Sequence, residues 1–379
     1  MRLPIYLDYN ATTPVAAEVA DAIDPYLREH FGNPSSSHCY GMRAREAVDR
    51  ARVQVAALIG ADPSEILFAG CATEANNLAI RGVARALRDK RRHIITSTIE
   101  HPAVMLPCLR LREDGWDVTI VRVDAAGRMD LEAISRALRT ETALVTIMHA
   151  NNEVGTLQDV AAIAAMAHAH GALMHTDAAQ SVGKIPVDVN ALGVDLLTIA
   201  GHKFYATKGV GALYVRRGTP VTPVIVGAEH EQGLRPGTEN VPAIVGLGKA
   251  AQLARESGPV QQTHLRKMRD LLHRLLAESV PGLTLNGHAE YRLPNTLNVS
   301  FPAVSGRKLL HAVEADVAAS VGSACHDGSD TVSGVLAAIG LTMERALGAV
   351  RLSVGMPTTE DEVRHAASVL AGAFRKEKT

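Results

Sequence analysis

A lysine and a cysteine are the residues of this sequence whose types and positions best suit covalent chemistry. Lys203 follows an apolar run at 196–200 that we interpret as a buried strand. At the carboxyl end of such a strand, where α/β sheets bind ligands, a lysine loses hydration, and its lowered pKa makes the amine a Schiff-base nucleophile. An isolated lysine of this kind is more often a solvated loop residue, and we interpret the nearby Lys208 in that way.

Cys325 lies in a segment rich in glycine, serine and aspartate, at 323–333. This composition predicts an exposed and mobile thiol, because a buried structural cysteine more often lies in an apolar run. Arg351 interrupts an apolar strand at 350–354, where an unpaired guanidinium is too costly to bury. A substrate carboxylate held by two hydrogen bonds would satisfy it, and so would an internal salt bridge; the sequence favours neither.

Asp177 follows another predicted strand, at 172–176, and precedes Lys203 by 26 residues. This spacing leaves room for one crossover, so neighbouring strands could present both side chains to one crevice. A carboxylate there could pair with a protonated pyridine nitrogen and keep a pyridoxal ring an electron sink. The alternative interpretation of Asp177 is a helix N-cap.

Polar residues follow three more predicted strands. The segment 70–74 combines small residues with the hydroxyl of Thr73 at a predicted helix start, which is typical of a phosphate site or of a tight turn capped by Thr73. His101 could stack on a cofactor ring and move protons, although a histidine taken at random is usually structural. Asn152 could bind substrate or shape a turn.

The elements that must position these residues alternate between strands and helices. Apolar residues between 42 and 59 follow helical spacing, and Gly60 is placed to cap that helix. Such alternation predicts a mainly parallel sheet covered on both faces. The predicted strands span 65–69, 93–97, 118–121, 143–148, 172–176, 196–200 and 211–215.

The pattern changes after about Gly258, where a long helix at 261–278 and a second α/β unit are predicted. We therefore expect a large domain over 14–258 and a smaller C-terminal α/β domain over 259–379. Residues 1–13 are expected to join the smaller domain, which is an expectation from the family resemblance described below.

Composition excludes several classes of protein. The 379 residues include 39 Lys and Arg against 40 Asp and Glu, so no basic excess favours nucleic acid or an anionic membrane. Four widely spaced cysteines predict neither a disulfide framework nor a metal site, and they fit a reducing cytoplasm. No signal peptide or long apolar run is apparent, so we expect a cytoplasmic protein without a membrane span.

Taken together and in this order, the motifs resemble those of the NifS-like cysteine desulfurases and selenocysteine lyases, which are class V aminotransferase-type enzymes. The resemblance covers nearly the whole chain. Besides the motifs above, it includes YLDYNATTP at 6–14, FGNPSS at 31–36, RPGTEN at 235–240 and RLSVG at 351–355. It implies the fold type I of pyridoxal 5'-phosphate (PLP)-dependent transferases, with a large α/β domain and a smaller one.

The resemblance also implies roles for the cofactor-binding residues. Lys203 matches the lysine that binds PLP, Asp177 the partner of the pyridine nitrogen, and Gln180 the donor to the ring oxygen. His101 matches the histidine that stacks on the ring. The phosphate-binding positions correspond to the backbone of Ala72 and to Thr73, His202 and Thr238.

Thr238 matches a residue that reaches the phosphate of the partner subunit, which implies a homodimer. Asn152 and Arg351 match the groups that bind the substrate carboxylate, and Cys325 matches the nucleophile. Two departures bear on the phosphate site: Ala69-Gly70-Cys71 replaces the usual Thr-Ser-Gly, and Ala200 replaces a serine.

The implied function is conversion of L-cysteine to L-alanine, with sulfur transferred to Cys325 as a persulfide and then to a protein acceptor. The sulfur would serve the synthesis of iron–sulfur clusters or thio-cofactors. The segments 198–205 and 319–326 look closer to selenocysteine lyases, so release of selenium from L-selenocysteine remains the alternative. A different PLP enzyme of the same fold, with Cys325 incidental, is a third interpretation.

Overall fold

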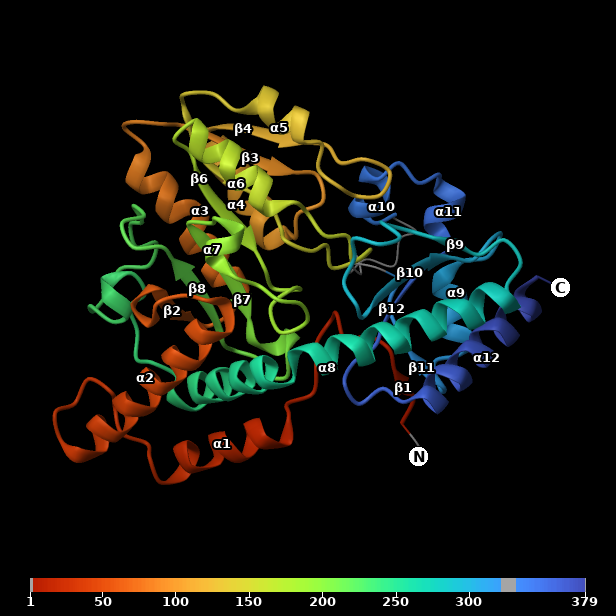
Figure 1. Ribbon diagram of the computed structural model, residues 1–379, viewed down its shortest axis with the longest axis horizontal. Helices are drawn as coiled ribbons and strands as arrows, with labels where there is room; N and C mark the ends of the chain where they lie inside the picture. Colours follow the sequence, from red (N-terminus) through yellow and green to blue (C-terminus); the bar gives the residue numbers. More distant parts are fainter. Residues whose placement is uncertain (1–2, 322–331, 379) are drawn as a thin grey trace.

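The protein is described by a computed structural model that covers residues 3–321 and 332–378. Its largest sheet has seven strands in the order β2-β8-β7-β6-β5-β3-β4 (Figure 1). These strands are β2 (Ile66–Ala69), β3 (His93–Ser97), β4 (Asp117–Val121), β5 (Thr142–Thr146), β6 (Leu173–Asp177), β7 (Leu196–Ala200) and β8 (Gly211–Val215).

The direction of the strands confirms the predicted, mainly parallel sheet. Strands β3 to β7 are parallel to their neighbours, whereas β8 runs antiparallel to both β7 and β2. The carboxyl ends of five adjacent strands therefore meet at one edge. The antiparallel direction of β8 is explained by the short link from β7, which leaves no room for a crossover helix.

Helices cover both faces of this sheet, and alternate strand residues face each layer. On one face, Ile95 and Leu197 pack with α2 (Cys39–Ile59), α6 (Val160–Ala169) and the first half of α8 (Val241–Ser279). On the other face, their neighbours Ile94 and Leu196 pack with α3 (Ala72–Leu87) and α4 (Pro102–Glu113). The remaining helices of this part are α1 (Ala17–Arg28), α5 (Leu131–Ala137) and α7 (Val189–Leu192), with the 3₁₀ turns η1 (Pro63–Glu65), η2 (Gly201–Lys203) and η3 (Glu231–Gly233).

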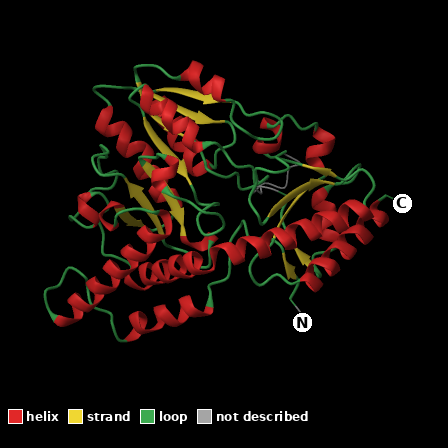
Figure 2. Cartoon of the chain, viewed as in Figure 1, coloured by secondary structure: helices red, strands yellow, loops and turns green. Residues whose placement is uncertain are grey.

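The C-terminal part has its own apolar core around a three-stranded antiparallel sheet of order β12-β10-β9. The second half of α8 and the last helix pack in that core (Figures 1 and 2). Its elements are β9 (Thr284–Leu285), β10 (Thr296–Ser300), α9 (Gly306–Ala312), α10 (Gly334–Ala338), α11 (Met343–Leu347), β12 (Ala349–Ser353) and α12 (Glu360–Glu377).

The first residues of the chain lie against this C-terminal part. Strand β1 (Ile5–Tyr6) pairs in parallel with β11 (Val317–Ala318), and Leu7 belongs to the C-terminal core. The division into 14–258 and 1–13 plus 259–379 remains a proposal. Residue 258 lies within α8, so a boundary there would be crossed by a continuous helix.

One helix is much longer than predicted. The helix predicted at 261–278 is the second half of α8, which begins twenty residues earlier at Val241 and contains Pro259. Pro259 does not break this helix, because the packing of α8 on both cores outweighs the lost hydrogen bond. Gly60 caps α2 in the left-handed region, as predicted, with a φ of 67°. Within the described residues, no helix is both long and apolar enough to cross a bilayer.

Candidate active site

The predicted site residues lie where the parallel strands of the large sheet end. Asp177 is the last residue of β6, and Lys203 lies in η2 directly after the adjacent strand β7. His101 follows β3 as the N-cap of α4, and Asn152 follows β5. Because these strands are parallel and adjacent, one edge of the sheet carries all four residues.

The amine of Lys203 is held by the N-terminal segment rather than by solvent. Its Nζ donates hydrogen bonds to the backbone oxygens of Asn10 at 2.7 Å and Ala11 at 2.8 Å. Burial and the nearby Arg351 lower the pKa of Lys203 to about 8, although the carboxylates of Asp177 and Asp8 oppose this shift. Lys208, by contrast, is exposed, as its interpretation as a solvated loop residue predicted.

Asp177 is buried and held on both oxygens. Oδ2 accepts a hydrogen bond from Asn76 Nδ2 at 2.8 Å, and Oδ1 accepts one from the backbone N–H of Ala179 at 2.9 Å. Both partners fix the side chain of Asp177, and each carboxylate oxygen can still accept a further hydrogen bond. Sequence reasoning missed Asn76, which comes from the interior of α3 and has no local signature.

Gln180 and the N-terminal Asn10 form a buried polar junction beside Lys203. Gln180 Nε2 donates to the backbone oxygen of Asn10 at 3.0 Å, the oxygen that also accepts from Lys203. Gln180 Oε1 accepts a hydrogen bond from Lys184 Nζ at 2.8 Å. Asn10 was quoted only as part of a longer motif, and neither it nor Lys184 was predicted as a site residue.

The start of α3 lies at the segment predicted to bind phosphate, but its capping differs from the prediction. The helix begins at Ala72 after an extended Cys71, and no side chain caps it. The interpretation of Thr73 as the cap is therefore wrong, because Thr73 lies inside the first turn with its side chain exposed. Free backbone N–H groups at this helix end suit an anion.

His202 is another predicted phosphate-binding residue, and Glu74 contacts the loop directly. His202 Nδ1 lies 3.1 Å from Thr12 Oγ1, and burial together with Lys203 lowers the pKa of His202 to about 4. Glu74 accepts hydrogen bonds from the backbone N–H of Gly70 at 2.8 Å and from Arg235 Nε at 2.7 Å. This ion pair ties the phosphate loop to the segment that carries Thr238.

His101 is oriented by its own helix. Its Nδ1 accepts a hydrogen bond from the backbone N–H of Ala103 at 3.1 Å, which leaves Nε2 as the protonated nitrogen of the neutral ring. Burial is the main cause that lowers the pKa of His101. The preceding Glu100 is buried, accepts from Ser97 Oγ and Met148 N, and has its pKa raised to about 8 by burial.

Arg351 is buried in β12 and forms an internal salt bridge. Its Nη2 lies 2.7 Å from Asp8 Oδ1, and Nη1 donates to the backbone oxygen of Asn152 at 3.1 Å. Nε is buried and has no partner among the described residues. The interpretation of Arg351 as part of an internal salt bridge is thus correct for this structure. The structure also places Arg351 against the backbone of Asn152, as the substrate-binding interpretation requires.

The two remaining predicted site residues are Thr238 and Cys325. Thr238 is exposed, near the start of α8. Cys325 lies outside the described residues. No group of three or more His, Cys, Asp or Glu side chains in the described part of the chain is arranged to bind a metal.

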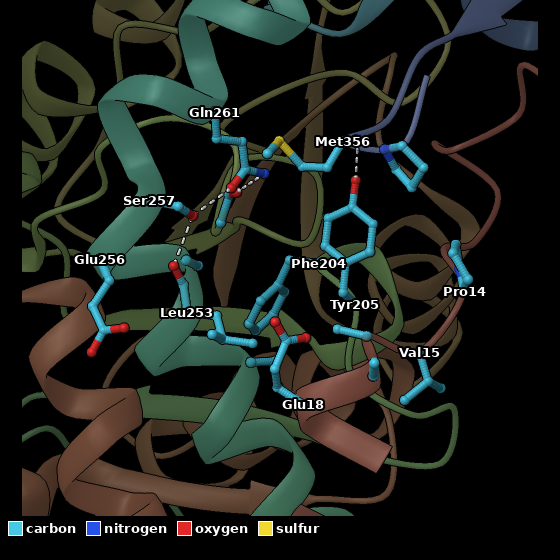
Figure 3. A pocket seen from close by; sticks show the side chains of 16 residues that line it. Pro14, Val15, Glu18, Phe204, Tyr205, Leu253, Glu256, Ser257, Gln261 and Met356 are labelled. Carbon is cyan, nitrogen blue, oxygen red and sulfur yellow. Dashed lines mark hydrogen bonds between the residues drawn. The ribbon is translucent and has the colours of Figure 1, made fainter. Parts of the chain in front are cut away.

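A cavity of about 560 Å³ lies beside the site rather than in it (Figure 3). Phe204, Tyr205 and Met356 line it, and the backbone N–H of Met356 donates to Tyr205 Oη at 2.7 Å. Its lining includes none of the predicted site residues that the structure describes. Tyr205 has a φ of 71°, so the turn after Lys203 is held in a conformation that side chains rarely adopt.

Comparison with known proteins agrees with this geometry. The model of the family Aminotransferase class-V matches residues 5–365. The chain is 45% identical to cysteine desulfurase IscS of Dictyoglomus turgidum, covering 100% of this chain and 96% of the relative. It is 46% identical to cysteine desulfurase IscS of Klebsiella pneumoniae, covering 98% of this chain and 92% of the relative.

Solved structures give the same result. A NifS-like protein superposes with a TM-score of 0.93 at 37% identity, covering 99% of this chain and 100% of the other. SspA in complex with cysteine superposes with a TM-score of 0.81 at 38% identity, covering 92% of this chain and 98% of the other. This chain therefore belongs to the class-V aminotransferase family and, within it, to the NifS-like cysteine desulfurases.

Proposed function

We propose that this cysteine desulfurase uses PLP to convert L-cysteine to L-alanine and transfers the sulfur to Cys325 as a persulfide. The observation that carries the proposal is the pairing of a lysine of lowered pKa with a buried aspartate on adjacent strands, Lys203 and Asp177. A protein acceptor for the sulfur, use in iron–sulfur cluster or thio-cofactor synthesis, and a cytoplasmic location complete the proposal.

The residues present fit PLP. Lys203 supplies an amine with a pKa of about 8, which is partly neutral at physiological pH and suits attack on an aldehyde. Asp177 supplies a carboxylate for the pyridine nitrogen, and the start of α3 at Ala72 supplies backbone donors for the phosphate. When bound, PLP supplies an electron sink for the Cα of the amino acid.

The chain's own residues supply the rest of the proposed chemistry. Lys203 moves the proton at the substrate Cα, and Asp177 holds a proton at the pyridine nitrogen. The Cys325 thiolate attacks the substrate sulfur, the C–S bond breaks with its electron pair moving to the carbon side, and a new S–S bond forms. His101, whose Nε2 carries the proton in the neutral ring, donates or accepts protons during this transfer.

Arg351 and Asn152 are proposed to bind the substrate carboxylate. Arg351 already uses two of its donors, toward Asp8 and the backbone of Asn152, while the buried Nε has no partner among the described residues. An incoming carboxylate would offer acceptors to this guanidinium in place of, or beside, Asp8. The internal salt bridge thus keeps the arginine satisfied until substrate arrives.

The lowered pKa of Lys203 predicts how cofactor capture depends on pH. Only the neutral amine attacks an aldehyde, so the rate of covalent capture by cofactor-free protein should rise with pH, with a midpoint near the pKa of about 8, and level off above it. The measurement is the growth of visible absorbance after PLP is added at a series of pH values. A midpoint near the ordinary lysine value of 10.5 would contradict a desolvated Lys203.

A homodimer is proposed because the chain exposes several large apolar side chains together with Thr238. Thr238 is exposed, and so are the large apolar residues Leu27, Phe31, Tyr40, Ile225 and Val226. Figure 1 shows the loop between α1 and α2 and the segment around η3 at the side far from the C-terminus. Apolar surface of this kind is typical of an interface between subunits.

The dimer leads to a test of Thr238. The protein should sediment as a dimer at micromolar concentration. Thr238→Ala should weaken PLP binding because one hydrogen bond to the phosphate is lost, but the variant should remain a dimer. Sedimentation and cofactor titration, run on both proteins, measure this. A monomer that retains full cofactor occupancy would contradict the proposed role of Thr238.

The substrate is tested by assaying alanine release from L-cysteine and L-selenocysteine in parallel. The desulfurase proposal expects turnover of cysteine together with a protein-bound persulfide. Turnover of selenocysteine alone would favour the lyase alternative. Release of keto acid or of other products, without alanine, would favour a different enzyme of the same fold.

A further inference from the structure

Lys184 is a buried cation with no role in the chemistry proposed so far. Its side chain is 5% exposed, and its Nζ donates to Gln180 Oε1 at 2.8 Å and to Asn10 Oδ1 at 3.2 Å. Both acceptors are neutral amides, which compensate a buried charge less well than a carboxylate does. Burial, and then the charges of Lys203 and Arg351, hold the pKa of Lys184 well below its usual range.

The contacts of Lys184 decide which way the amide of Gln180 faces. Lys184 Nζ donates to Gln180 Oε1 and to Asn10 Oδ1, so the amide oxygen of Gln180 faces Lys184. On the other side, the amide lies 3.0 Å from the backbone oxygen of Asn10, which only accepts, so the NH₂ group must face that side. The two ends of the amide are thus fixed by independent neighbours.

The NH₂ group of Gln180 carries two hydrogens, and its hydrogen bond to Asn10 uses one of them. Asn10 O is also the acceptor for Lys203 Nζ, so the second hydrogen is offered close to the amine that would hold the cofactor. A rotated amide would present its oxygen there instead and would repel an anionic ring oxygen. The orientation of one side chain therefore decides between attraction and repulsion.

We propose that Lys184 is a positioning residue that fixes the amide of Gln180 with its NH₂ group toward the ring oxygen of the cofactor. The proposal rests on the proposed function, because it needs bound PLP. Lys184 acts through Gln180, which is four residues earlier in the chain, and through Asn10. Asn10 is itself held at Oδ1 by Asn295 Nδ2, at 2.9 Å.

The experiment is a double-mutant cycle on the full-length protein with PLP as the probe. The variants are Lys184→Met, which keeps the length of the side chain and removes the donors, Gln180→Ala, and the two combined. Lys208→Met, a change at an exposed lysine, is the matched control. For each protein we would measure the dissociation constant for PLP and the pH midpoint of the visible absorbance of the bound cofactor.

We expect K184M to weaken PLP binding about tenfold, the size of one hydrogen bond to a charged group. The pH midpoint should rise, because a donor beside the ring oxygen stabilises its anionic form. Q180A should show similar changes, and the double variant should be no worse than Q180A alone, since coupled residues are not additive. K208M should match the wild type.

Additive effects in the double variant, or a K184M protein that binds and titrates like the wild type, would overturn the role of Lys184 and leave the proposed function intact. Wild-type protein that gains no visible absorbance with PLP would overturn the proposed function, and the role of Lys184 with it. Should K184M not fold, Lys184→Leu, which also removes the donors, replaces it in the same cycle, with the same expected non-additivity and the same contradicting result.

Discussion

Lys203→Ala is expected to abolish covalent attachment of PLP and to lower alanine production by at least about 10³-fold. Two lysine amines of lowered pKa lie near Asp177 in the described part of the chain, Lys203 and Lys184. Only Lys203 is not fully buried, so its amine is the one that can reach the cofactor. The measurement is mass spectrometry after borohydride reduction in the presence of PLP. The wild type should gain the mass of the reduced cofactor on the peptide that contains Lys203, and the variant should not.

Lys208→Ala provides the control for this experiment. Lys208 follows five residues later, is exposed, and lies in the turn before β8. Its removal should leave covalent attachment and turnover unchanged. Unchanged borohydride labelling in Lys203→Ala would show that another amine holds the cofactor, and the assignment of Lys203 would be wrong.

Cys325→Ala is expected to keep PLP and lose the desulfurase reaction. The cofactor contacts proposed here come from other segments, so the visible absorbance should be unchanged, and Arg351 and Asn152 should still bind cysteine. Persulfide formation should disappear and sulfide release should fall by roughly 10³-fold, because a single thiolate makes the S–S bond. Sulfide release with added reductant and mass spectrometry of the protein-bound persulfide measure both effects.

Cys108→Ala is the matched control for the Cys325 experiment. Cys108 is buried in α4, and burial raises the pKa of its thiol to about 12, so it supplies almost no thiolate. Its removal should leave the persulfide intact. If Cys325→Ala releases sulfide from cysteine at the wild-type rate, the thiol of Cys325 is not the nucleophile; if only its selenocysteine activity survives, the lyase alternative gains support.

The sequence predicted those parts of the site that depend on the ends of strands. Asp177, Lys203 and His101 each follow a short apolar run, and the crossover spacing was enough to place them on one edge of a parallel sheet. Their chemistry was predicted from the set of motifs rather than from any one residue, because a lone aspartate could be a helix N-cap and a lone lysine a solvated loop residue.

The remaining contacts depend on pairings between distant segments, which no local pattern contains. Asn76 lies in the interior of a helix, and Lys184 follows the predicted motif by four residues, so neither looks unusual in the sequence. Asn10 reaches Lys203 across 193 residues. The length of α8 was missed for a related reason, since its packing on two cores outweighs the local effect of Pro259.

The pairing of the two ends of the chain bears on the order of events during synthesis. Asp8 and Arg351 are 343 residues apart, and β1 pairs with β11 near residue 317. Asn10, which holds Lys203, is in turn held by Thr296 and Ser353. The large sheet can form while the ribosome is still translating, but the lysine acquires its acceptors only after β12 has emerged. A nascent chain therefore lacks the full set of contacts that position the Lys203 amine until β12 has been synthesised.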